Sequence, residues 1–252
     1  IEGVTEFLPV SSTGHMILAS SVMNIKNPEF AKTFEIVIQL GAIMAVFALY
    51  WKRFFVSLDI YVKLLIAFIP TGILGILAYK TIKHYLFNPI TVSTSLIIGG
   101  VILILLDKWS EKKESKYKSI EEDSYKDAAM IGLIQCVSMI PGVSRAAATI
   151  FGGIYSGFNR KQAAEFSFLL AIPTMLAASG YDLLKNHDNI HKSDLMLILI
   201  GAGVAFLVAI FAVKAFVSFL TKRGFKFFGY YRIALGIIFL VCAYYAGLQL
   251  PA

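Results

Sequence analysis

Two short stretches of the sequence place ionisable and hydroxyl side chains inside otherwise apolar segments. The first stretch reads EGVTEFLPVSSTGH and runs from Glu2 to His15. Glu2 and Glu6 are spaced i and i+4, so both carboxylates fall on one face of a helix. A helix that restarts after Pro9 would begin with hydroxyl residues and would leave free N–H groups at its positive end.

That helix start indicates an anion site, and phosphate is the anion that helix N-termini usually bind. The hydroxyl residues concerned are Ser11, Ser12 and Thr13. His15 follows Ser12 at i+3 and is within reach of the same face. Close helix packing is an alternative role for Ser11 and Thr13, because small residues favour contact between membrane helices.

The second stretch, PGVSRAAAT, runs from Pro141 to Thr149 and repeats the design with an arginine added. Ser144 stands at the new helix start, and the planar guanidinium of Arg145 suits phosphate oxygens. Arg145 could instead pair with an acid of the first stretch as a structural bridge. A single charge at the bilayer centre costs about 2.5–3.5 kcal/mol on insertion scales, so four ionisable groups together favour a functional site.

The composition predicts a membrane protein. Of the 252 residues, 58% are hydrophobic and 15% are charged, whereas soluble domains carry about 25% charged residues. The net charge of +7 comes from lysines in short loops, which favours contact with anionic headgroups and not with nucleic acid. Cys136 and Cys242 lack metal-ligand spacing and are expected to pack. The remaining histidines are expected in solvated loops, at His84, His187 and His191.

Six apolar runs are long enough to span a bilayer, which requires about 20 residues. They are 32–50, 58–79, 90–106, 163–184, 195–218 and 230–249. Two further apolar segments, 1–24 and 127–157, are broken by proline and polar residues, so we expect re-entrant helical hairpins covered by protein. The sequence opens at Ile1 inside a motif, and we expect an upstream segment with a further membrane helix to precede it.

The chain divides into two similar halves, 1–106 and 127–252, joined by a charged segment, 107–126, that we expect to be a solvated cytoplasmic linker. At an offset of 132 residues, identical residues align at four positions: Pro9 with Pro141, Ser12 with Ser144, Ala31 with Ala163, and Phe34 with Phe166. We therefore predict an all-α polytopic protein with two repeats, each a re-entrant hairpin plus three transmembrane helices.

The repeats should have inverted topology, because a hairpin returns to the side it entered from. Thirteen lysines and arginines then fall on one side and six on the other. The richer side is expected to be cytoplasmic. The hairpin tips would then meet within the bilayer, as in many transporters.

The two motifs together resemble the signature pair of the bacterial undecaprenyl-diphosphate phosphatases of the bacitracin-resistance type. The resemblance extends through AKTFEIVIQLGAI, FNPI and AAEFSFLLAIP, and so covers nearly the whole chain. It implies hydrolysis of undecaprenyl diphosphate to the monophosphate in the bacterial inner membrane, which recycles the lipid carrier of cell-wall synthesis. It also implies a site open to the outer, periplasmic side and a divalent cation, Mg²⁺ or Ca²⁺.

By motif position, the resemblance assigns Glu2, Glu6, Ser12 and His15 to the first signature. It assigns the remaining site residues, Ser144, Arg145 and Thr149, to the second. The family usually has serine where Ala146 stands, so one hydroxyl contact to phosphate would be missing; Ala147 replaces a common glycine.

We accordingly expect two roles within this set. Glu2, Glu6, Ser12, His15 and Arg145 would be catalytic, with the two acids serving as cation ligands or in proton transfer. The phosphate would be bound by Ser11, Ser12, Thr13, Ser144, Arg145 and Thr149. Ser12 or His15 could be the nucleophile, or His15 could act as a base for Ser12 or for water.

The expected partners are a polyprenyl diphosphate and membrane lipids, and the sequence does not decide between a monomer and a homodimer. Phe34, Phe166 and Phe168 could line an opening for the lipid tail, although aromatic residues on apolar spans more often pack. A lipid or ion transporter built on inverted repeats is the main alternative function, and a membrane scaffold is a third.

Overall fold

The computed structural model spans residues 1–252 and describes all of them except 24–27, 87, 112–114, 118, 187–194 and 247–252. The described residues form helices and connecting turns, without a strand. The first half contains α1 (Glu2–Thr5), α2 (Ser12–Met23), α3 (Pro28–Tyr50), α4 (Asp59–Leu86) and α5 (Pro89–Ser110). The second contains α6 (Tyr125–Gln135), α7 (Arg145–Ser156), α8 (Arg160–Asn186), α9 (Leu195–Arg223) and α10 (Lys226–Ala246). Short 3₁₀ turns lie at Trp51–Phe55, Ile120–Glu122 and Cys136–Met139.

Five helices within the described part are long and apolar enough to cross a membrane: Thr33–Phe55, Asp59–Ala78, Ile90–Ser110, Arg160–Leu184 and Leu195–Arg223. They correspond to five of the six predicted spans. α10 covers most of the sixth, 230–249, whose last three residues lie outside the described part. The chain is therefore an all-helical, multi-pass membrane protein.

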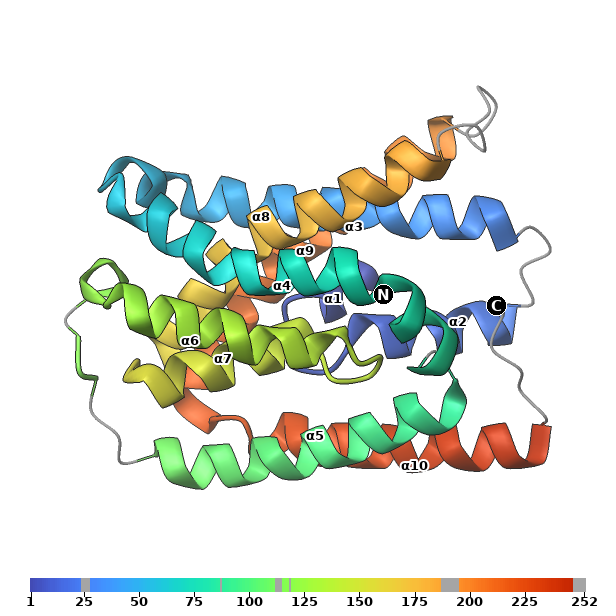
Figure 1. Ribbon diagram of the computed structural model, residues 1–252. Helices are drawn as coiled ribbons and strands as arrows, with labels where there is room; N and C mark the ends of the chain where they lie inside the picture. The colour runs from blue at the N-terminus through green and yellow to red at the C-terminus, as the bar shows by residue number, and fades with distance from the viewer. Residues whose placement is uncertain (24–27, 87, 112–114, 118, 187–194, 247–252) are drawn as a thin grey trace.

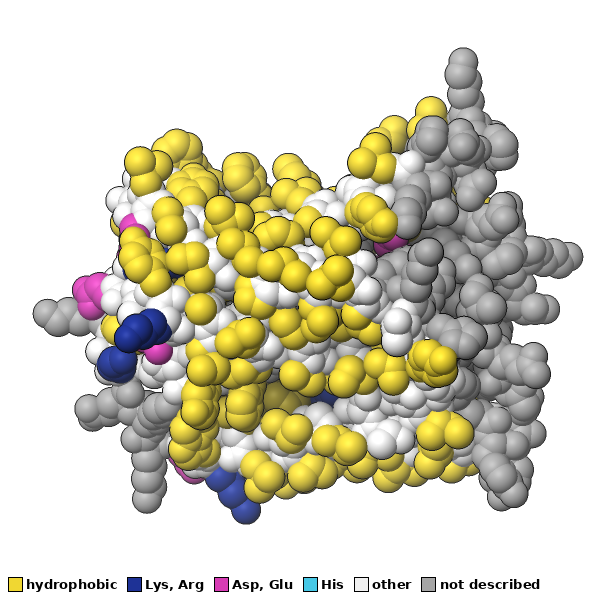
Figure 2. Space-filling view, viewed as in Figure 1, with side chains coloured by type: hydrophobic (Ala, Val, Ile, Leu, Met, Phe, Trp, Pro, Cys, Tyr) yellow, Lys and Arg dark blue, Asp and Glu magenta, His cyan; other side chains and the backbone are white. Residues whose placement is uncertain are grey.

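The long helices form the outside of the molecule and the short ones lie between them (Figure 1). α5 packs along α10 on one side, and α3 packs against α8 and α9 on the other. The hydrophobic side chains spread across the visible face, whereas most visible charged side chains gather toward its left end (Figure 2). This distribution suits contact with lipid around the long helices.

Both predicted broken segments are broken helices. α1 and α2 are separated by a turn that contains Pro9, and α6 and α7 by a turn that contains Pro141. The first arm of each broken segment, α1 or α6, approaches a long helix closely at a glycine. A Cβ at Gly3 would meet the backbone of α9, and one at Gly132 would meet the backbone of α4. Small residues at these contacts let the backbones approach.

The segment 107–126 is packed at several described positions, contrary to the expectation of a solvated linker. Residues 107–110 belong to α5, and Ile120 is 1% exposed. Asp107 accepts a hydrogen bond from the N–H of Phe225 at 2.7 Å and pairs with Arg160 at 2.9 Å. Buried side chains in an apolar setting need such partners, which the sequence pattern did not reveal.

The aromatic and cysteine side chains expected to pack do so where they are described. Phe166 and Phe168 are fully buried in the core, and Phe34 packs against Gly201, so these rings pack between helices. Cys136 and Cys242 are free and partly buried. The expected solvation of three histidines lies outside the described part of the structure: His187, His191 and the side chain of His84.

Candidate active site

The two hairpins use the same device to start their second arms. Ser11 (φ 69°) and Ser144 (φ 74°) are the non-glycine residues with positive φ among those described. Each caps the next helix: the Ser11 hydroxyl accepts from Gly14 N–H at 3.4 Å, and the Ser144 hydroxyl accepts from Ala147 N–H at 3.2 Å. Non-glycine residues in this region cost about 1–3 kcal/mol, and such strain concentrates at functional sites.

This capping pattern shifts the alignment of the hairpins by one residue. Ser11, and not Ser12 as the constant offset predicts, is the structural counterpart of Ser144. Ser12 therefore lies in the first turn of α2, where its hydroxyl is free to make other contacts.

The two hairpins meet at Glu6. One oxygen of its carboxylate accepts a hydrogen bond from the Ser12 hydroxyl at 2.5 Å. The other pairs with Nη2 of Arg145 at 3.1 Å, with both side chains largely buried. The structure thus connects a hydroxyl, a carboxylate and a guanidinium across two segments that are far apart in the sequence.

Arg145 is held in place by α8 and by the first hairpin. Its Nη1 donates to the carbonyl of Ser167 at 2.8 Å, and its guanidinium lies 5.7 Å from the centre of the Phe7 ring. Its Nε is buried and has no hydrogen-bond partner among the described residues. An unsatisfied buried donor is uncommon in folded proteins, so this N–H is an unused donor beside the contact with Glu6.

Thr149 is fully buried, and its hydroxyl is already occupied. It lies 2.6 Å from the Ser167 hydroxyl and donates to the Arg145 carbonyl at 2.9 Å. This arrangement links α7 to α8 near Arg145 and leaves the hydroxyl with protein partners in place of phosphate. Ala146 is also fully buried, within the core, so a serine at that position would need a partner in the core.

Glu2 lies beside Glu6 and is 5% exposed. Its Oε1 is buried and has no hydrogen-bond partner among the described residues. Two adjacent carboxylates with one uncommitted oxygen fit Mg²⁺, which is usually held by one or two carboxylates together with substrate phosphates. The described part of the chain contains no group of three or more His, Cys, Asp or Glu that could hold a metal, so the phosphates would have to complete the coordination.

His15 points to a different partner from the one expected. One ring nitrogen, Nδ1, lies 2.8 Å from the carbonyl of Ser11, and Nε2 lies 2.6 Å from the Tyr231 hydroxyl. The two rings are stacked, with centroids 5.6 Å apart. A carbonyl can only accept, so Nδ1 carries a proton and Nε2 is the acceptor in the neutral ring. Thr13 is exposed at the start of α2.

Arg232 of α10 is a residue that the sequence motifs do not include. It is completely buried, and it donates to backbone carbonyls of both hairpin turns: Pro9 at 3.0 Å, Gly142 at 2.8 Å and Val143 at 2.9 Å. It also donates to the carbonyls of Ser95 and Leu96 in α5. No acid pairs with it in the described residues, so its charge is satisfied by peptide dipoles alone.

Arg232 needs space that only a glycine leaves. A Cβ at Gly99 of α5 would collide with its guanidinium. The signal in the sequence was a single arginine within the apolar run 230–249, where the insertion cost calls for a buried partner. The structure thus identifies Arg232 as the residue that ties the two turns to each other and to α5.

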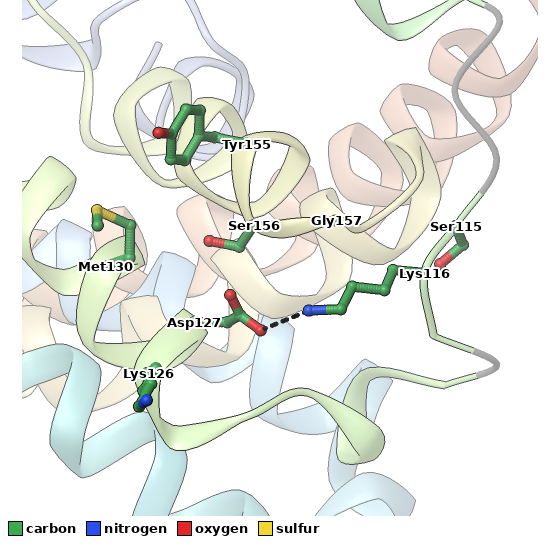
Figure 3. A pocket seen from close by; sticks show the side chains of 8 residues that line it. All are labelled: Ser115, Lys116, Lys126, Asp127, Met130, Tyr155, Ser156 and Gly157. Carbon is green, nitrogen blue, oxygen red and sulfur yellow. Dashed lines mark ion pairs between the residues drawn. The ribbon is translucent and has the colours of Figure 1, made fainter.

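Two cavities lie away from Glu6 and Arg145, neither of which lines them. One, of about 500 Å³, lies between the segment 115–116 and helices α6 and α7 (Figure 3). There the ammonium of Lys116 is 3.6 Å from Asp127. The other, of about 480 Å³, lies between α3, α8 and α9.

Comparison with known proteins agrees with the motif resemblance. The family described as "Bacitracin resistance protein BacA" matches residues 1–238. A protein of Bdellovibrio bacteriovorus named undecaprenyl-diphosphatase is 50% identical over 97% of this chain and 93% of its own length. Proteins with the same name are 53% identical in Wolinella succinogenes, over 95% of this chain and 93% of their own, and 52% in Flavobacterium johnsoniae, over 97% and 93%.

Proposed function

The chain belongs to the bacitracin resistance protein BacA family, and we infer that it is a membrane phosphatase that hydrolyses undecaprenyl diphosphate to undecaprenyl phosphate and inorganic phosphate. Three of its relatives carry the corresponding name at 50–53% identity over nearly their whole length. This activity recycles the lipid carrier of cell-wall synthesis and accounts for the family's association with bacitracin resistance. A transporter is not favoured, because these relatives are named as hydrolases.

The contact between the hairpins is the observation that supports the site. Glu6 joins Ser12 to Arg145, while Glu2 Oε1 and Arg145 Nε are buried beside this contact and have no hydrogen-bond partner among the described residues. A carboxylate oxygen and an N–H donor that are both unsatisfied suit a charged ligand that brings phosphate oxygens and a cation. A structural ion pair alone would leave these two atoms unexplained.

We assign the nucleophile to Ser12 and the base to Glu6. The Ser12 oxygen attacks the terminal phosphorus, the bond from that phosphorus to the bridging oxygen breaks, and undecaprenyl phosphate leaves with the electron pair. Glu6 accepts the serine proton across the 2.5 Å hydrogen bond. Water then hydrolyses the phosphoserine and releases inorganic phosphate. Arg145 and the free N–H groups at the start of α2 stabilise the charge on the transferred phosphoryl group.

His15 takes a positioning role in this assignment, because both of its ring nitrogens are engaged by Ser11 and Tyr231. Glu2, whose Oε1 has no hydrogen-bond partner among the described residues, would hold the divalent cation, Mg²⁺ or Ca²⁺, while Glu6 serves as the base. That cation supplies charge neutralisation on the diphosphate.

We also propose that the two halves are inverted repeats. Several helix contacts support this, because they occur in exchanged pairs: α1 packs on α9 as α6 packs on α4, and α3 packs on α9 as α8 packs on α4. The pairs α3·α8 and α5·α10 would then lie on the pseudo-twofold axis. The end of the molecule that carries the thirteen lysines and arginines of the richer side is called the lysine-rich end. With this end in the cytoplasm of a bacterial inner membrane, the site would open to the periplasm. A homodimer stays a proposal.

A phosphoenzyme trap tests the nucleophile. Purified protein in detergent is mixed with a polyprenyl diphosphate carrying ³²P on the terminal phosphate, quenched within milliseconds and mapped by peptide. Label is expected on Ser12 and absent from Ser12→Ala, while Thr13→Ala, which removes a neighbouring exposed hydroxyl, keeps it. Label on His15, or phosphate release by Ser12→Ala at the parental rate, would contradict the assignment.

A further inference from the structure

The cavity between α3, α8 and α9 lies at the lysine-rich end of the molecule. It is formed by the last turn of α3, the first turns of α8 and the last third of α9. Its lining residues are Leu49, Tyr50, Lys161, Glu165, Val213, Lys214, Val217, Ser218 and Thr221. None of them forms a hydrogen bond or ion pair with Glu6 or Arg145, so the proposed hydrolysis does not account for this cavity.

The cavity carries an unbalanced positive charge. Its acid, Glu165, is paired with Arg53 at 3.1 Å. Its two lysines, Lys161 and Lys214, are exposed and have no ion-pair partner among the described residues. The cavity in Figure 3 differs, because Lys116 there is paired with Asp127.

The position of Lys214 requires an explanation. It lies nine residues before Arg223, the last residue of α9, which at 1.5 Å per residue is about 13 Å along the axis of a membrane-spanning helix. A lysine inside an apolar membrane helix and without an acid is costly, although its flexible stem can carry the ammonium toward the interface. An anion drawn in between the helices would offset that cost.

The other groups of the cavity suit a phosphate attached to apolar chains. The Ser218 and Tyr50 hydroxyls make no hydrogen bond within the described residues and can donate to phosphate oxygens. Leu49, Val213 and Val217 supply apolar wall beside them. Outside the cavity, Phe47 and Phe211 are exposed by 46% and 72%, on the surface that faces lipid.

We propose that this cavity binds the headgroup phosphate of an anionic phospholipid, with Lys161 and Lys214 as its cationic contacts. Basic pockets between membrane helices at the cytoplasmic side are known to hold such headgroups. The acyl chains follow the apolar surface of α3 and α9. This lipid site is separate from the proposed active site and does not depend on the proposed hydrolysis.

Native mass spectrometry of the purified protein in detergent tests the proposal by titration with phosphatidylglycerol, phosphatidylcholine or inorganic phosphate. We expect the first phosphatidylglycerol to bind at least tenfold more tightly than phosphatidylcholine. The double variant Lys161→Gln/Lys214→Gln should weaken phosphatidylglycerol roughly thirty-fold, since each lysine near an anionic headgroup contributes about 1 kcal/mol.

Two controls separate this site from general charge and from the active site. Lys108→Gln/Lys226→Gln removes the same charge from exposed positions outside the cavity and should keep the affinity, as should Arg145→Gln. Phosphate release by the Lys161→Gln/Lys214→Gln protein without added lipid shows that it is folded. Equal binding of the two lipids, unchanged binding in the cavity variant, or full reproduction of the effect by inorganic phosphate would overturn the proposal.

Discussion

The two hairpins have nearly the same backbone construction, but the first carries acidic side chains and the second carries an arginine. Both place a glycine of the first arm, Gly3 or Gly132, against the backbone of a long helix, and both start the second arm at a strained serine cap. Three residues after these glycines stand Glu6 in one hairpin and Gln135 in the other. Gln135 is fully buried, and its amide donates to the Thr71 hydroxyl at 2.8 Å.

With the two halves as the inverted repeats proposed above, a repeated scaffold carries a single site. The first hairpin supplies acids and a hydroxyl, the second supplies a guanidinium, and the position equivalent to Glu6 is neutral and satisfied. The shared construction therefore explains the meeting of the turns, and the difference in side chains explains where chemistry can occur.

Changing Glu6 to Gln should have the largest effect, because it makes the first hairpin chemically like the second. Phosphate release should fall about a thousandfold, since the variant loses the proton acceptor of Ser12 and the partner of Arg145. Gln135→Ala, the matched change in the second hairpin, should alter the rate less than threefold. A loss of similar size in both variants would show that the hairpins are not chemically distinct.

Removing the residue that joins the hairpins should act on stability. In Arg232→Gln, carbonyls of both turns lose their donor, and buried acceptors left unsatisfied cost about 1–3 kcal/mol each. We expect a loss of about 3 kcal/mol, seen as a decrease in Tm of roughly 6–12 °C in detergent. Arg223→Gln at the end of α9 is the control, and an equal Tm in the two variants would contradict the role of Arg232.

The two strained serine caps, Ser11 and Ser144, should lose similar stability when their hydroxyls are removed. Ser11→Ala and Ser144→Ala each lose an N-cap hydrogen bond while they keep the positive φ, so each should cost about 1 kcal/mol. Thermal unfolding of the two proteins under one condition provides the measurement. A cost at only one of the positions would mean that the caps are not equivalent, and that the hairpins differ in backbone as well as in side chains.

The smallest expected effect concerns the connecting segment. Burial raises the pKa of Asp123 to about 6, against the opposing effect of Lys63. The folded chain therefore holds this proton more tightly than the unfolded chain, whose aspartate pKa is about 3.9. The contribution of Asp123 to stability is present below about pH 4 and is lost as the pH rises to about 6.

Tm measured at pH 4.5 and pH 7 for the parent and Asp123→Asn tests this pH dependence. The Tm of the parent minus the Tm of Asp123→Asn should decrease as the pH rises. The difference in Tm between the parent and Glu111→Gln, a change at an exposed position after α5, should stay constant. A parental advantage that grows with pH would mean that the ion pair with Lys63 outweighs burial.

Sequence patterns predicted the features that depend on composition and local periodicity. The long apolar runs located the membrane helices, and Pro9 and Pro141, which stand among small and polar residues, located the breaks. Proline alone is not sufficient, because Pro70 and Pro173 stand inside α4 and α8 without ending them. The contact between Arg145 and an acid of the first hairpin could also be expected, since buried charges need partners.

The remaining features depend on backbone acceptors and on three-dimensional packing. Arg232 binds carbonyls, which every residue has, so no residue type identifies its partners. The one-residue shift between Ser11 and Ser144 comes from the longer turn in the second hairpin. The burial of Asp107 and Ile120 within a charged segment follows from contacts with α8 and, for Asp107, with the N–H of Phe225 just before α10, which no local pattern encodes.

The central claim is that Glu6 and Arg145 act together on the substrate and are not merely a structural bridge. Phosphate release by Glu6→Gln, Arg145→Gln and the double variant, each per mole of folded protein, tests it most directly. Each single change should cost about a thousandfold, and the double variant should be no faster than the slower single variant. Recovery of the double variant to within tenfold of the parent would contradict the claim, because a bridge needs only that neither charge is left unpaired.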